Sequence, residues 1–590
     1  MKLTAFTHTQ EQILDLIPGY SRDTGFHLTP ITRIGSGEIG GKAHGLLSAK
    51  ALIDRLDLSG ELEGISVSIP RMVVLTTEVF DLFMERNELQ ELVKSEISDV
   101  RIADAFQRGD FPTEYVGDLM TLAQSLTTPI AVRSSSRLED ALYRPFAGVY
   151  GTKMVPNNQF SSSERFLRLI EAIKYVYAST YFREARIYRR NCTDDTTEEK
   201  MAVILQEVVG KRHGERFYPE VSGVARSFNF YAMNWVRPED GVIDLALGLG
   251  KTVVDGEAAW TYSPHLPHVG PPFNTISDML KHSQVTFWAV NMEKPTVYDP
   301  VNEAEYLIRC DLPDAEVDGS LKFLASTFDS ESGRIRSGIS TRGPRLLNFT
   351  PILTHNRVPL NQLLKLLLKE CETALGSPVE IEFAMSLDLE DGLPASFGFL
   401  QVRPIVIDSV NVEFGEEDFE ATNVLLASDN ALGNGIIDTI EDIILVRRDL
   451  FDWKHTPVIA NEIEYLNARL IRENRNSILV GYGRWGTTDE WRGIPVHVGQ
   501  ISSARVIIEA TLPGMVVSPS QGSHFFHNLT SFRVFYFSMP HENSLRNIAW
   551  DVLDACEIIE ETQFVQLLRA RSPFKTMVDG KTRRGIILHG

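Results

Sequence analysis

The sequence predicts a multidomain protein of the α+β and α/β classes, in which a large N-terminal unit precedes a smaller α/β unit. Its 590 residues suggest roughly two to four domains. Short apolar runs of strand type alternate with amphipathic runs of helix type up to residue 407, and the alternation restarts beyond an acidic stretch at 413–420. We therefore predict one domain over residues 1–407, a linker over 408–425 and a second domain over 426–590.

Apolar spacing locates the individual elements along the chain. Continuous apolar runs predict buried strands, and apolar positions three and four residues apart predict helices that pack on one face. In the first unit, helices are expected at 43–56, 78–86, 166–190 and 360–375, and strands at 73–75, 201–209, 243–247, 379–385 and 397–405. In the second unit, strands are expected at 478–480 and 504–510, and a helix at 548–562.

The charge and the cysteines narrow the class of protein. A formal net charge of −21 disfavours binding to nucleic acid or an anionic membrane, and it leaves room for a local basic pocket. The four cysteines are far apart, show no C-x-x-C spacing and form no disulfide framework, which indicates a reducing compartment. We recognise no signal peptide and no apolar run of about 20 residues, so a cytoplasmic location and no membrane partner are expected.

The most informative stretch runs from Ala131 to Asp140, with the sequence AVRSSSRLED. An apolar run ends there in Arg133, which is followed by Ser134 and two more serines. A strand that delivers a fixed cation and several hydroxyls into a loop suits a polyphosphate, because a guanidinium forks onto phosphate oxygens and hydroxyls bond the remainder. Arg133 and Ser134 are therefore candidate phosphate-binding residues.

A glycine-rich turn at 35–42 comes directly before the first expected helix and ends in Gly41 and Lys42. Glycines let backbone amides approach a phosphate, the start of a helix offers free N–H groups, and the lysine is long enough to reach the same phosphate. A flexible loop with a solvated lysine explains the same residues. The turn is not a P-loop, because alanine follows Lys42 where Ser or Thr would be required.

The expected hairpin at 379–405 carries a second set of polar residues. Because side chains alternate along a strand, one face of the first strand holds two glutamates, and one face of the return strand holds two phenylalanines, a glutamine and an arginine. If the two faces coincide, oxygen ligands for Mg²⁺ and a cation for phosphate converge. The alternative is a solvent-facing hairpin with a Glu–Arg ion pair. The residues are Glu380, Glu382, Phe397, Phe399, Gln401 and Arg403.

The strand expected at 201–209 ends in Gln206, Glu207, Val208 and Val209. Backbone groups at a strand end can hydrogen-bond the edge of an adenine while apolar neighbours hold the ring. An ordinary buried strand explains these residues equally well, so Gln206, Val208 and Val209 are candidates for the adenine site on position alone.

Together these segments resemble the nucleotide-binding domain of the phosphoenolpyruvate synthase and pyruvate phosphate dikinase family over about 400 residues. The motifs are G-G-K at 40–42, V-x-T-T-x-x-F at 73–80, A-V-R-S-S at 131–135 with F-A-G at 146–148, G-L-G at 248–250, and L-Q-x-R-P at 400–404. The resemblance implies a two-lobed ATP-grasp fold that clamps ATP and Mg²⁺.

The resemblance also implies roles for single residues. Lys42 and Arg133 would hold phosphates, and Arg403 would sit on the transferring phosphoryl groups. The magnesium ligands would be Glu380, Glu382 and Gln401, and the adenine would lie at 206–209.

Some positions depart from the family pattern. Lys251 stands where the family has glutamate after G-L-G, and residues 225–229 replace its F-T-x-x-P. The family's phosphohistidine carrier motif is not recognised, and the residues beyond 407 are too few for a barrel of roughly 250 residues that would bind pyruvate. Pyruvate is therefore not expected as the substrate, and the type of transfer stays open.

The second unit holds its own dense clusters at 481–489 and 518–528. Glycine-rich loops that contain arginine, aspartate and histidine suit an anion or catalytic site. His524 could carry a phosphoryl group, because neutral imidazole is a nucleophile near pH 7. A packed, hydrogen-bonded core histidine is the alternative, since aromatic residues surround it in sequence.

We expect an ATP- and Mg²⁺-dependent phosphotransferase that passes a phosphoryl group to a histidine or a small-molecule acceptor. Its catalytic candidates are Arg133, Arg403 and His524. An ATP-grasp ligase that forms an acyl phosphate is one alternative, and an ATP-binding sensor without turnover is another. The expected partners are ATP and an unidentified small-molecule or protein acceptor, and a homo-oligomer is compatible with the sequence.

Overall fold

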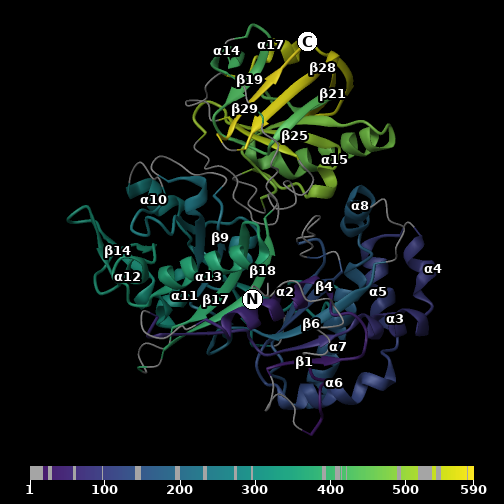
Figure 1. Ribbon diagram of the computed structural model, residues 1–590, viewed down its shortest axis with the longest axis vertical. Helices are drawn as coiled ribbons and strands as arrows, with labels where there is room; N and C mark the ends of the chain where they lie inside the picture. The colour runs from purple at the N-terminus through teal and green to yellow at the C-terminus, as the bar shows by residue number, and fades with distance from the viewer. Residues whose placement is uncertain are drawn as a thin grey trace.

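The elements form three groups around separate sheets. The computed structural model describes residues 17–23, 30–56, 62–95, 97–137, 139, 148–192, 199–229, 236–271, 276–293, 297–387, 392, 394–405, 412, 415–419, 421–487, 493–515, 534–539, 547–580 and 582–590. In Figure 1 the purple and blue group lies at lower right, the teal group at lower left, and the green and yellow C-terminal group above both. The expected mixed α+β organisation in more than one unit is confirmed.

The first group is built on a five-stranded sheet. Only β1 and β3 are parallel, and the other neighbours in the sheet are antiparallel. Helices, among them the four named below, cover one face, and their apolar residues join those of the strands in one core. In spatial order the strands are β1 (Ile31–Ile34), β3 (Met72–Leu75), β6 (Met201–Glu207), β4 (Ile130–Ser136) and β5 (Thr152–Val155), and the helices are α3 (Thr77–Arg86), α5 (Asp99–Arg108), α6 (Thr113–Ser125) and α7 (Ser162–Ser179).

The second group centres on a six-stranded sheet that contains the expected hairpin. The same group contains a four-stranded and a three-stranded sheet, whose strands come between those of the six-stranded sheet along the chain. Helix α13 (Leu360–Leu375) packs on the six-stranded sheet. The six strands in spatial order are β11 (Trp260–Tyr262), β10 (Val242–Ala246), β9 (Val221–Arg226), β17 (Val379–Ser386), β18 (Ala395–Pro404) and β2 (Ile65–Ser68). The smaller sheets are β13 (Leu307–Asp311), β12 (Thr286–Asn291), β8 (Arg216–Tyr218) and β7 (Lys211–His213), and β15 (Arg334–Ser337), β14 (Ala325–Asp329) and β16 (Arg345–Leu347).

Helix α2 (Gly40–Ile53) joins the first two sheets. Its apolar residues share one core with residues of both sheets, and it contacts β4 as well as β18. The start of the helix packs closely against the last residues of β4 and the segment after it. A Cβ on Gly40 would lie 1.7 Å from the Ser135 carbonyl oxygen, and a Cβ on Gly41 would lie 1.7 Å from the Glu139 carbonyl oxygen. Only glycine allows this approach, so the G-G-K motif first of all lets α2 dock on β4.

The C-terminal group is a nine-stranded mixed sheet. Its centre is parallel, and helix α15 (Thr456–Arg472) connects the first two parallel strands and packs on the sheet. The central strands are β21 (Gly435–Val446), β22 (Ser477–Tyr482), β25 (Ala504–Ala510) and β26 (Phe535–Met539), and the outer ones are β19 (Val424–Ser428), β20 (Ala431–Leu432), β27 (Glu557–Glu561), β28 (Val565–Asp579) and β29 (Arg584–Leu588). This arrangement confirms the strands expected at 478–480 and 504–510.

Two expected helices differ from the structure. The helix expected at 166–190 is two helices, α7 and α8 (Arg183–Cys192). The chain breaks there because Tyr181 stacks on Phe80, and because the Asp99 carboxylate accepts from the Arg183 backbone N–H to start a new helix. The helix expected at 548–562 is the short α17 (Trp550–Asp554) followed by strand β27. Pairing of β27 with β28 overrides the helical spacing of its residues.

The hairpin contains a bulge that the alternation rule does not foresee. β17 and β18 pair in antiparallel register, and the register shifts between Glu382 and Phe383. On one side of the shift Glu382 faces Gln401, whereas on the other Phe383 faces Phe399 within the apolar core. The prediction that Phe397 and Phe399 share a face with Gln401 is therefore wrong. One extra residue at the bulge shifts the alternation, so the phenylalanine side chains lie on the opposite face of the sheet from the Gln401 side chain.

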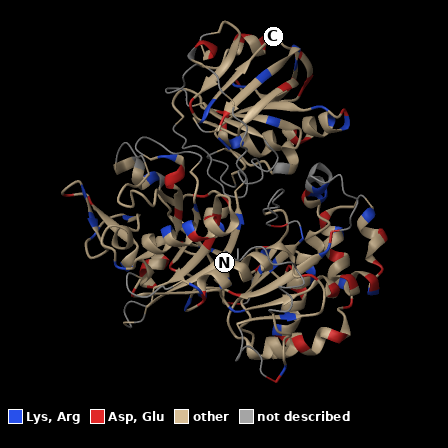
Figure 2. Ribbon diagram, viewed as in Figure 1, with Lys and Arg blue, Asp and Glu red and all other residues tan. Residues whose placement is uncertain are grey.

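The surface charge and the helix lengths add two bulk facts. Figure 2 shows basic and acidic residues interspersed over all three groups. Within the described part of the chain, every helix is too short or too polar to cross a bilayer.

Candidate functional site

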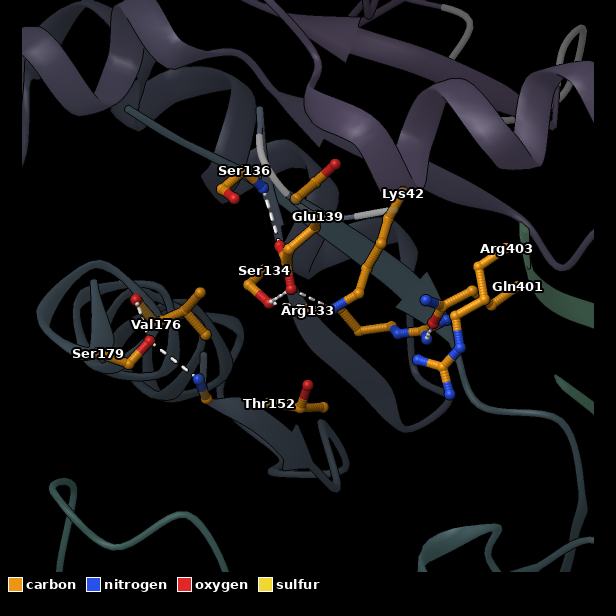
Figure 3. Close-up of polar contacts among 12 residues, drawn as sticks. Lys42, Arg133, Ser134, Ser136, Glu139, Thr152, Val176, Ser179, Gln401 and Arg403 are labelled. Atoms are coloured by element: carbon orange, nitrogen blue, oxygen red, sulfur yellow. Dashed lines mark hydrogen bonds and ion pairs between the residues drawn. The ribbon is translucent and has the colours of Figure 1, made fainter. Parts of the chain in front are cut away.

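Arg133, in the middle of β4, reaches from the first sheet to the second. Its Nη1 atom donates to the backbone oxygen of Leu400 at 2.8 Å and to Gln206 Oε1 at 3.1 Å. Its Nη2 atom donates to Gln401 Oε1 at 2.7 Å and lies 3.6 Å from Glu382 Oε2. One guanidinium therefore connects β4, β6 and both strands of the hairpin, and Figure 3 shows Arg133 beside Gln401 and Arg403.

The hairpin presents its polar residues in facing pairs. Glu380 is in register with Arg403, and Glu382 is in register with Gln401. Arg403 is 1% exposed; its Nη2 atom donates to Glu380 Oε1 and lies 3.7 Å from Glu382 Oε1. The two polar faces do coincide, and they face Arg133 rather than solvent. The solvent-facing alternative is excluded.

A third arginine closes the cluster from the neighbouring strand. Arg226, at the end of β9, donates from Nε to Glu380 Oε2 at 2.6 Å and from Nη1 to Asp244 Oδ2 at 2.8 Å. Asp244 also accepts from the Thr261 hydroxyl at 2.6 Å. Burial opposes the charge on Arg226, but Glu380 and Asp244 outweigh it and raise its pKa, so the guanidinium stays charged. Both oxygens of Glu380 are thus held by arginines.

The cluster balances its charges across five strands. Three arginines, Arg133, Arg226 and Arg403, face three carboxylates, Asp244, Glu380 and Glu382. None of the six side chains is more than 15% exposed. Burying ions is costly unless each one is paired, and a fold gains little from a full network compared with an apolar core. Such a network at the junction of two sheets is the kind of charged, preorganised site that binds a charged ligand.

Lys42 lies at the start of α2, and its side chain reaches Ser134, the residue that follows Arg133 on β4. Its ammonium donates to Glu139 Oε1 at 2.6 Å and to the Ser134 hydroxyl at 3.1 Å. The Glu139 carboxylate also accepts from that hydroxyl at 2.9 Å and from the Ser136 backbone N–H at 2.8 Å. Figure 3 shows this chain of contacts. Lys42 is therefore a buried cation that Ser134 and Glu139 hold in place close to Arg133. The alternative of a solvated lysine is excluded.

An apolar patch lies where the first sheet meets the four-stranded sheet. Its buried members pack against partly buried side chains from β5, β12 and the segment after β6. The patch comprises Met154, Val208, Phe217, Leu249, Trp288, Val290, Met292 and Leu307. An apolar patch that is only partly covered by the protein can accept a flat ring.

Lys251 borders this patch. Its ammonium lies 5.8 Å from the centre of the Trp288 ring and 2.7 Å from Asp255 Oδ2. Burial works to lower the pKa of Lys251, but the ion pair with Asp255 prevails and holds it above its ordinary value. The position that departs from the family pattern therefore adds a fixed positive charge at the rim of the patch.

The structure brings most of the expected site residues together. Arg133, Gln206 and the four polar hairpin residues form one cluster, Lys42 with Gly41 and Ser134 form the adjoining one, and Val208 lies in the apolar patch. Val209 instead packs over Gly398, where a Cβ would lie 2.5 Å from it. His524 lies outside the described residues.

Sequence reasoning missed Arg226, Asp244 and Glu139. Arg226 was visible as part of the departure at 225–229, and Glu139 as the glutamate of the Glu-Asp pair. Neither signal said what lies opposite, because the partners Glu380 and Lys42 are far away in sequence.

The described residues hold no group of three or more histidine, cysteine or acidic side chains arranged for a metal ion. A cation at this site would therefore depend on two oxygen donors that face each other, Glu382 and Gln401, and on oxygens of its ligand. This donor set fits Mg²⁺, which takes oxygen ligands and usually shares them with phosphates.

Comparison with known proteins gives one family. No protein with a curated description matches the chain. The model of the family "Pyruvate phosphate dikinase, AMP/ATP-binding domain" matches residues 36–420, which include every described member of the two charged clusters. That match spans more than half of the 590 residues. The chain therefore belongs to the family of the pyruvate phosphate dikinase AMP/ATP-binding domain, a family of ATP-binding phosphotransferases of the kinase and dikinase type.

Proposed function

We propose that the protein is an ATP- and Mg²⁺-dependent phosphotransferase that clamps ATP between its first two groups, as two lobes of an ATP-grasp fold. The single observation that carries this is Arg133. It comes from the first sheet and donates to Gln401 on the second, within 3.6 Å of Glu382. A ligand seated at this junction touches both lobes at once.

The phosphate chain would lie along β4, between Lys42 and Arg403. An ammonium has three N–H groups, and Lys42 uses two of them on Ser134 and Glu139, which leaves one for a phosphate oxygen. Arg133 and Arg403 are held in place before any ligand arrives, so no reorganisation is needed as charge develops on the phosphoryl group. Gly41 and Ser134 keep Lys42 in this position.

Mg²⁺ would be held by Glu382 and Gln401 together with the phosphates, where it would neutralise charge and draw the phosphate oxygens into line. Glu380 has a different part in this proposal. Both of its oxygens accept from guanidinium groups, those of Arg226 and Arg403, so it orients Arg403 and two positive charges oppose a cation there. Gln401 accepts from Arg133 through Oε1, and the metal would share that oxygen with it. The expectation of three direct ligands is thereby narrowed to two.

The adenine would rest on the apolar patch at Val208. Val208 follows β6 directly, and Gln206 on the same strand accepts from Arg133. The ring would therefore lie next to the phosphate site at a spacing that one strand sets. The side chain of Val209 packs over Gly398 and contributes to the strand position instead.

The acceptor is a histidine or a small molecule. His524 is the candidate carrier within the chain, and its segment belongs to the part beyond the family match. A neutral imidazole attacks either the γ or the β phosphorus, and the bond from that phosphorus to the bridging oxygen on its adenosine side breaks. Attack on the γ phosphorus transfers a phosphoryl group and releases ADP, and attack on the β phosphorus transfers a pyrophosphoryl group and releases AMP.

The decisive experiment uses ATP labelled at the β and γ phosphates. AMP as a product, with label retained on the protein and lost in His524→Ala, supports the dikinase reaction with a carrier. ADP formed only with a carboxylate and an amine identifies an ATP-grasp ligase instead. Tight ATP binding without any product in cell extract identifies a sensor. In each case Arg403→Gln is compared with Arg336→Gln, which removes an arginine that is 55% exposed.

A further inference from the structure

The C-terminal group touches the other two groups at separate points. Arg484, the first residue of the short strand after β22, donates from Nη1 to the backbone oxygen of Gly256 at 3.2 Å. On the other side, Arg183 of α8 pairs with Glu464 of α15, and Figure 1 shows α15 directly above α8. Arg484 is 6% exposed, whereas the Arg183 side chain is 60% exposed. The two contacts therefore differ in kind.

The strand that carries Arg484 is anchored from within its own group. β23 (Arg484–Trp485) pairs with β24 (Gly493–Ile494), and the Trp485 ring is fully buried, with its N–H donating to the Ile508 oxygen at 3.3 Å. A Cβ on Gly481 would lie 2.4 Å from that ring, so this glycine is needed for the packing. Neighbours on a strand point to opposite sides, and Arg484 therefore points out of the C-terminal core. The packing of the Trp485 ring therefore explains why glycine stands at position 481.

Gly256 is the residue that ends the turn carrying Lys251. Helix α9 (Lys251–Val254) closes with Gly256 at φ +71°, and the Gly256 and Glu257 backbone N–H groups donate back to Val253 and Thr252. This is a Schellman closure, in which glycine tolerates the left-handed conformation. Its carbonyl oxygen points outward and meets Arg484.

The other end of the same turn is fixed on β12. The Leu249 N–H donates to the Trp288 oxygen at 2.9 Å, and a Cβ on Gly248 would lie 2.6 Å from that oxygen. Lys251 thus sits on a short turn that is held at one end by the strand beneath the apolar patch and at the other by the C-terminal group.

We propose that Arg484 is a positioning residue for the nucleotide site. Arg484 holds the turn that carries Lys251, and so keeps Lys251 at the rim of the apolar patch. Resting on the proposed function, this gives the C-terminal group a part in ATP binding: Lys251 meets the nucleotide only while Arg484 holds Gly256. Arg484 acts through Lys251 and does not itself touch the nucleotide.

The test measures the ATP affinity of the full chain by isothermal titration calorimetry with Mg²⁺ present. Arg484→Gln is expected to weaken ATP binding about tenfold, because a buried charge-assisted hydrogen bond is lost. Arg484→Lys keeps a donor for the Gly256 oxygen and is expected to recover most of that affinity. Arg183→Gln removes the ion pair between Arg183 and Glu464 and is expected to change the affinity less than about twofold.

A double-variant cycle distinguishes positioning from mere docking. Lys251→Met is expected to weaken ATP binding about tenfold, and the Arg484→Gln, Lys251→Met double variant should be no weaker than either single one, because both remove one interaction. Full additivity, wild-type affinity in Arg484→Gln, or an equal loss in Arg183→Gln overturns the proposal. Failure of the wild-type chain to bind ATP overturns the proposed function itself and this inference with it.

Discussion

Buried charges occur both in the nucleotide-binding part and in the C-terminal group, and the two clusters differ in construction. Asp442 of β21 is 1% exposed and accepts from Arg475 and Arg569, whose side chains are each about one-third exposed. All of these residues belong to one sheet and the turn beside it. The cluster at Arg133 instead joins two sheets, and none of its side chains is more than 15% exposed.

The difference separates a structural cluster from a binding cluster. Arginines that keep contact with water can satisfy a buried carboxylate at low cost, and they tie one sheet together. A network that buries both signs at the junction of two lobes costs more, and its positions are preorganised for a charged ligand. Variants in the cluster at Asp442 should therefore change stability alone, and variants in the cluster at Arg133 should change binding and turnover.

The largest effect is expected for Arg403→Gln. This variant takes the Arg403 guanidinium from the Glu380 carboxylate, which keeps its ion pair with Arg226, and removes the guanidinium proposed to lie on the transferring phosphoryl group. We expect turnover of ATP to fall about 10³-fold, as for the loss of a preorganised cation in phosphoryl transfer. The rate of AMP or ADP release measures it, with circular dichroism to verify folding. Retention of half the wild-type rate would place Arg403 outside the chemistry.

Lys42→Met comes next. Glu139 would lose its cation and keep only the Ser134 hydroxyl and the Ser136 N–H as donors. We expect ATP affinity to fall about 30-fold and the protein to lose stability, because a buried carboxylate is left without its charge partner. Calorimetric titration and thermal unfolding give both values. Adding Glu139→Gln should restore stability without restoring affinity; recovery of affinity would make the role of Lys42 structural.

Asp442→Asn tests the charged cluster of the C-terminal group. The variant removes the charge that Arg475 and Arg569 share, so we expect a loss of about 2 kcal/mol in the free energy of unfolding. ATP affinity and turnover should stay at wild-type values. Urea unfolding followed by fluorescence measures the first and calorimetry the second. A change in ATP affinity here would erase the distinction between the two clusters.

The smallest effect is a pH dependence at Glu257. Burial raises the pKa of this carboxyl above its ordinary value of 4.5, with Arg309 and the Trp288 N–H acting against the shift. A raised folded pKa gives stability that is complete below the unfolded pKa and is lost as the pH rises through the folded one. Glu257→Gln should remove that loss, so its melting temperature relative to the wild type should rise by about 1 °C between pH 4 and pH 7. A flat difference across this range would contradict the shift.

Local pattern was sufficient for much of the fold and for part of the site. The strand that carries Arg133, the hairpin of Glu382 and Gln401, and the helix at Lys42 follow from apolar spacing, glycine placement and alternation, all of which act within a few residues. Two boundaries differ from the expectation, since β4 continues to Ser136 and α2 already begins at Gly40. Motif order then suggested that these segments meet, which the contacts of Arg133 bear out.

What could not be predicted depends on pairing between distant segments. The clamp of Arg226 on Glu380 arises because β9 and β17 are neighbours, with these two residues in register. The bulge after Glu382 and the strand β27 likewise come from pairing across the sheet, which no local spacing reports. Tertiary neighbours thus decide which polar residues form the site.

The central claim is that Arg133, Glu382, Gln401 and Arg403 surround one magnesium nucleotide. Calorimetric titration of the full chain with ATP, in the presence of Mg²⁺ and again with EDTA, tests it most directly. We expect one tight site whose affinity drops at least tenfold without Mg²⁺, and a Glu382→Gln variant that binds weakly in both conditions. A wild-type chain that gives no heat with Mg·ATP, or a Glu382→Gln variant that binds as the wild type does, would contradict it.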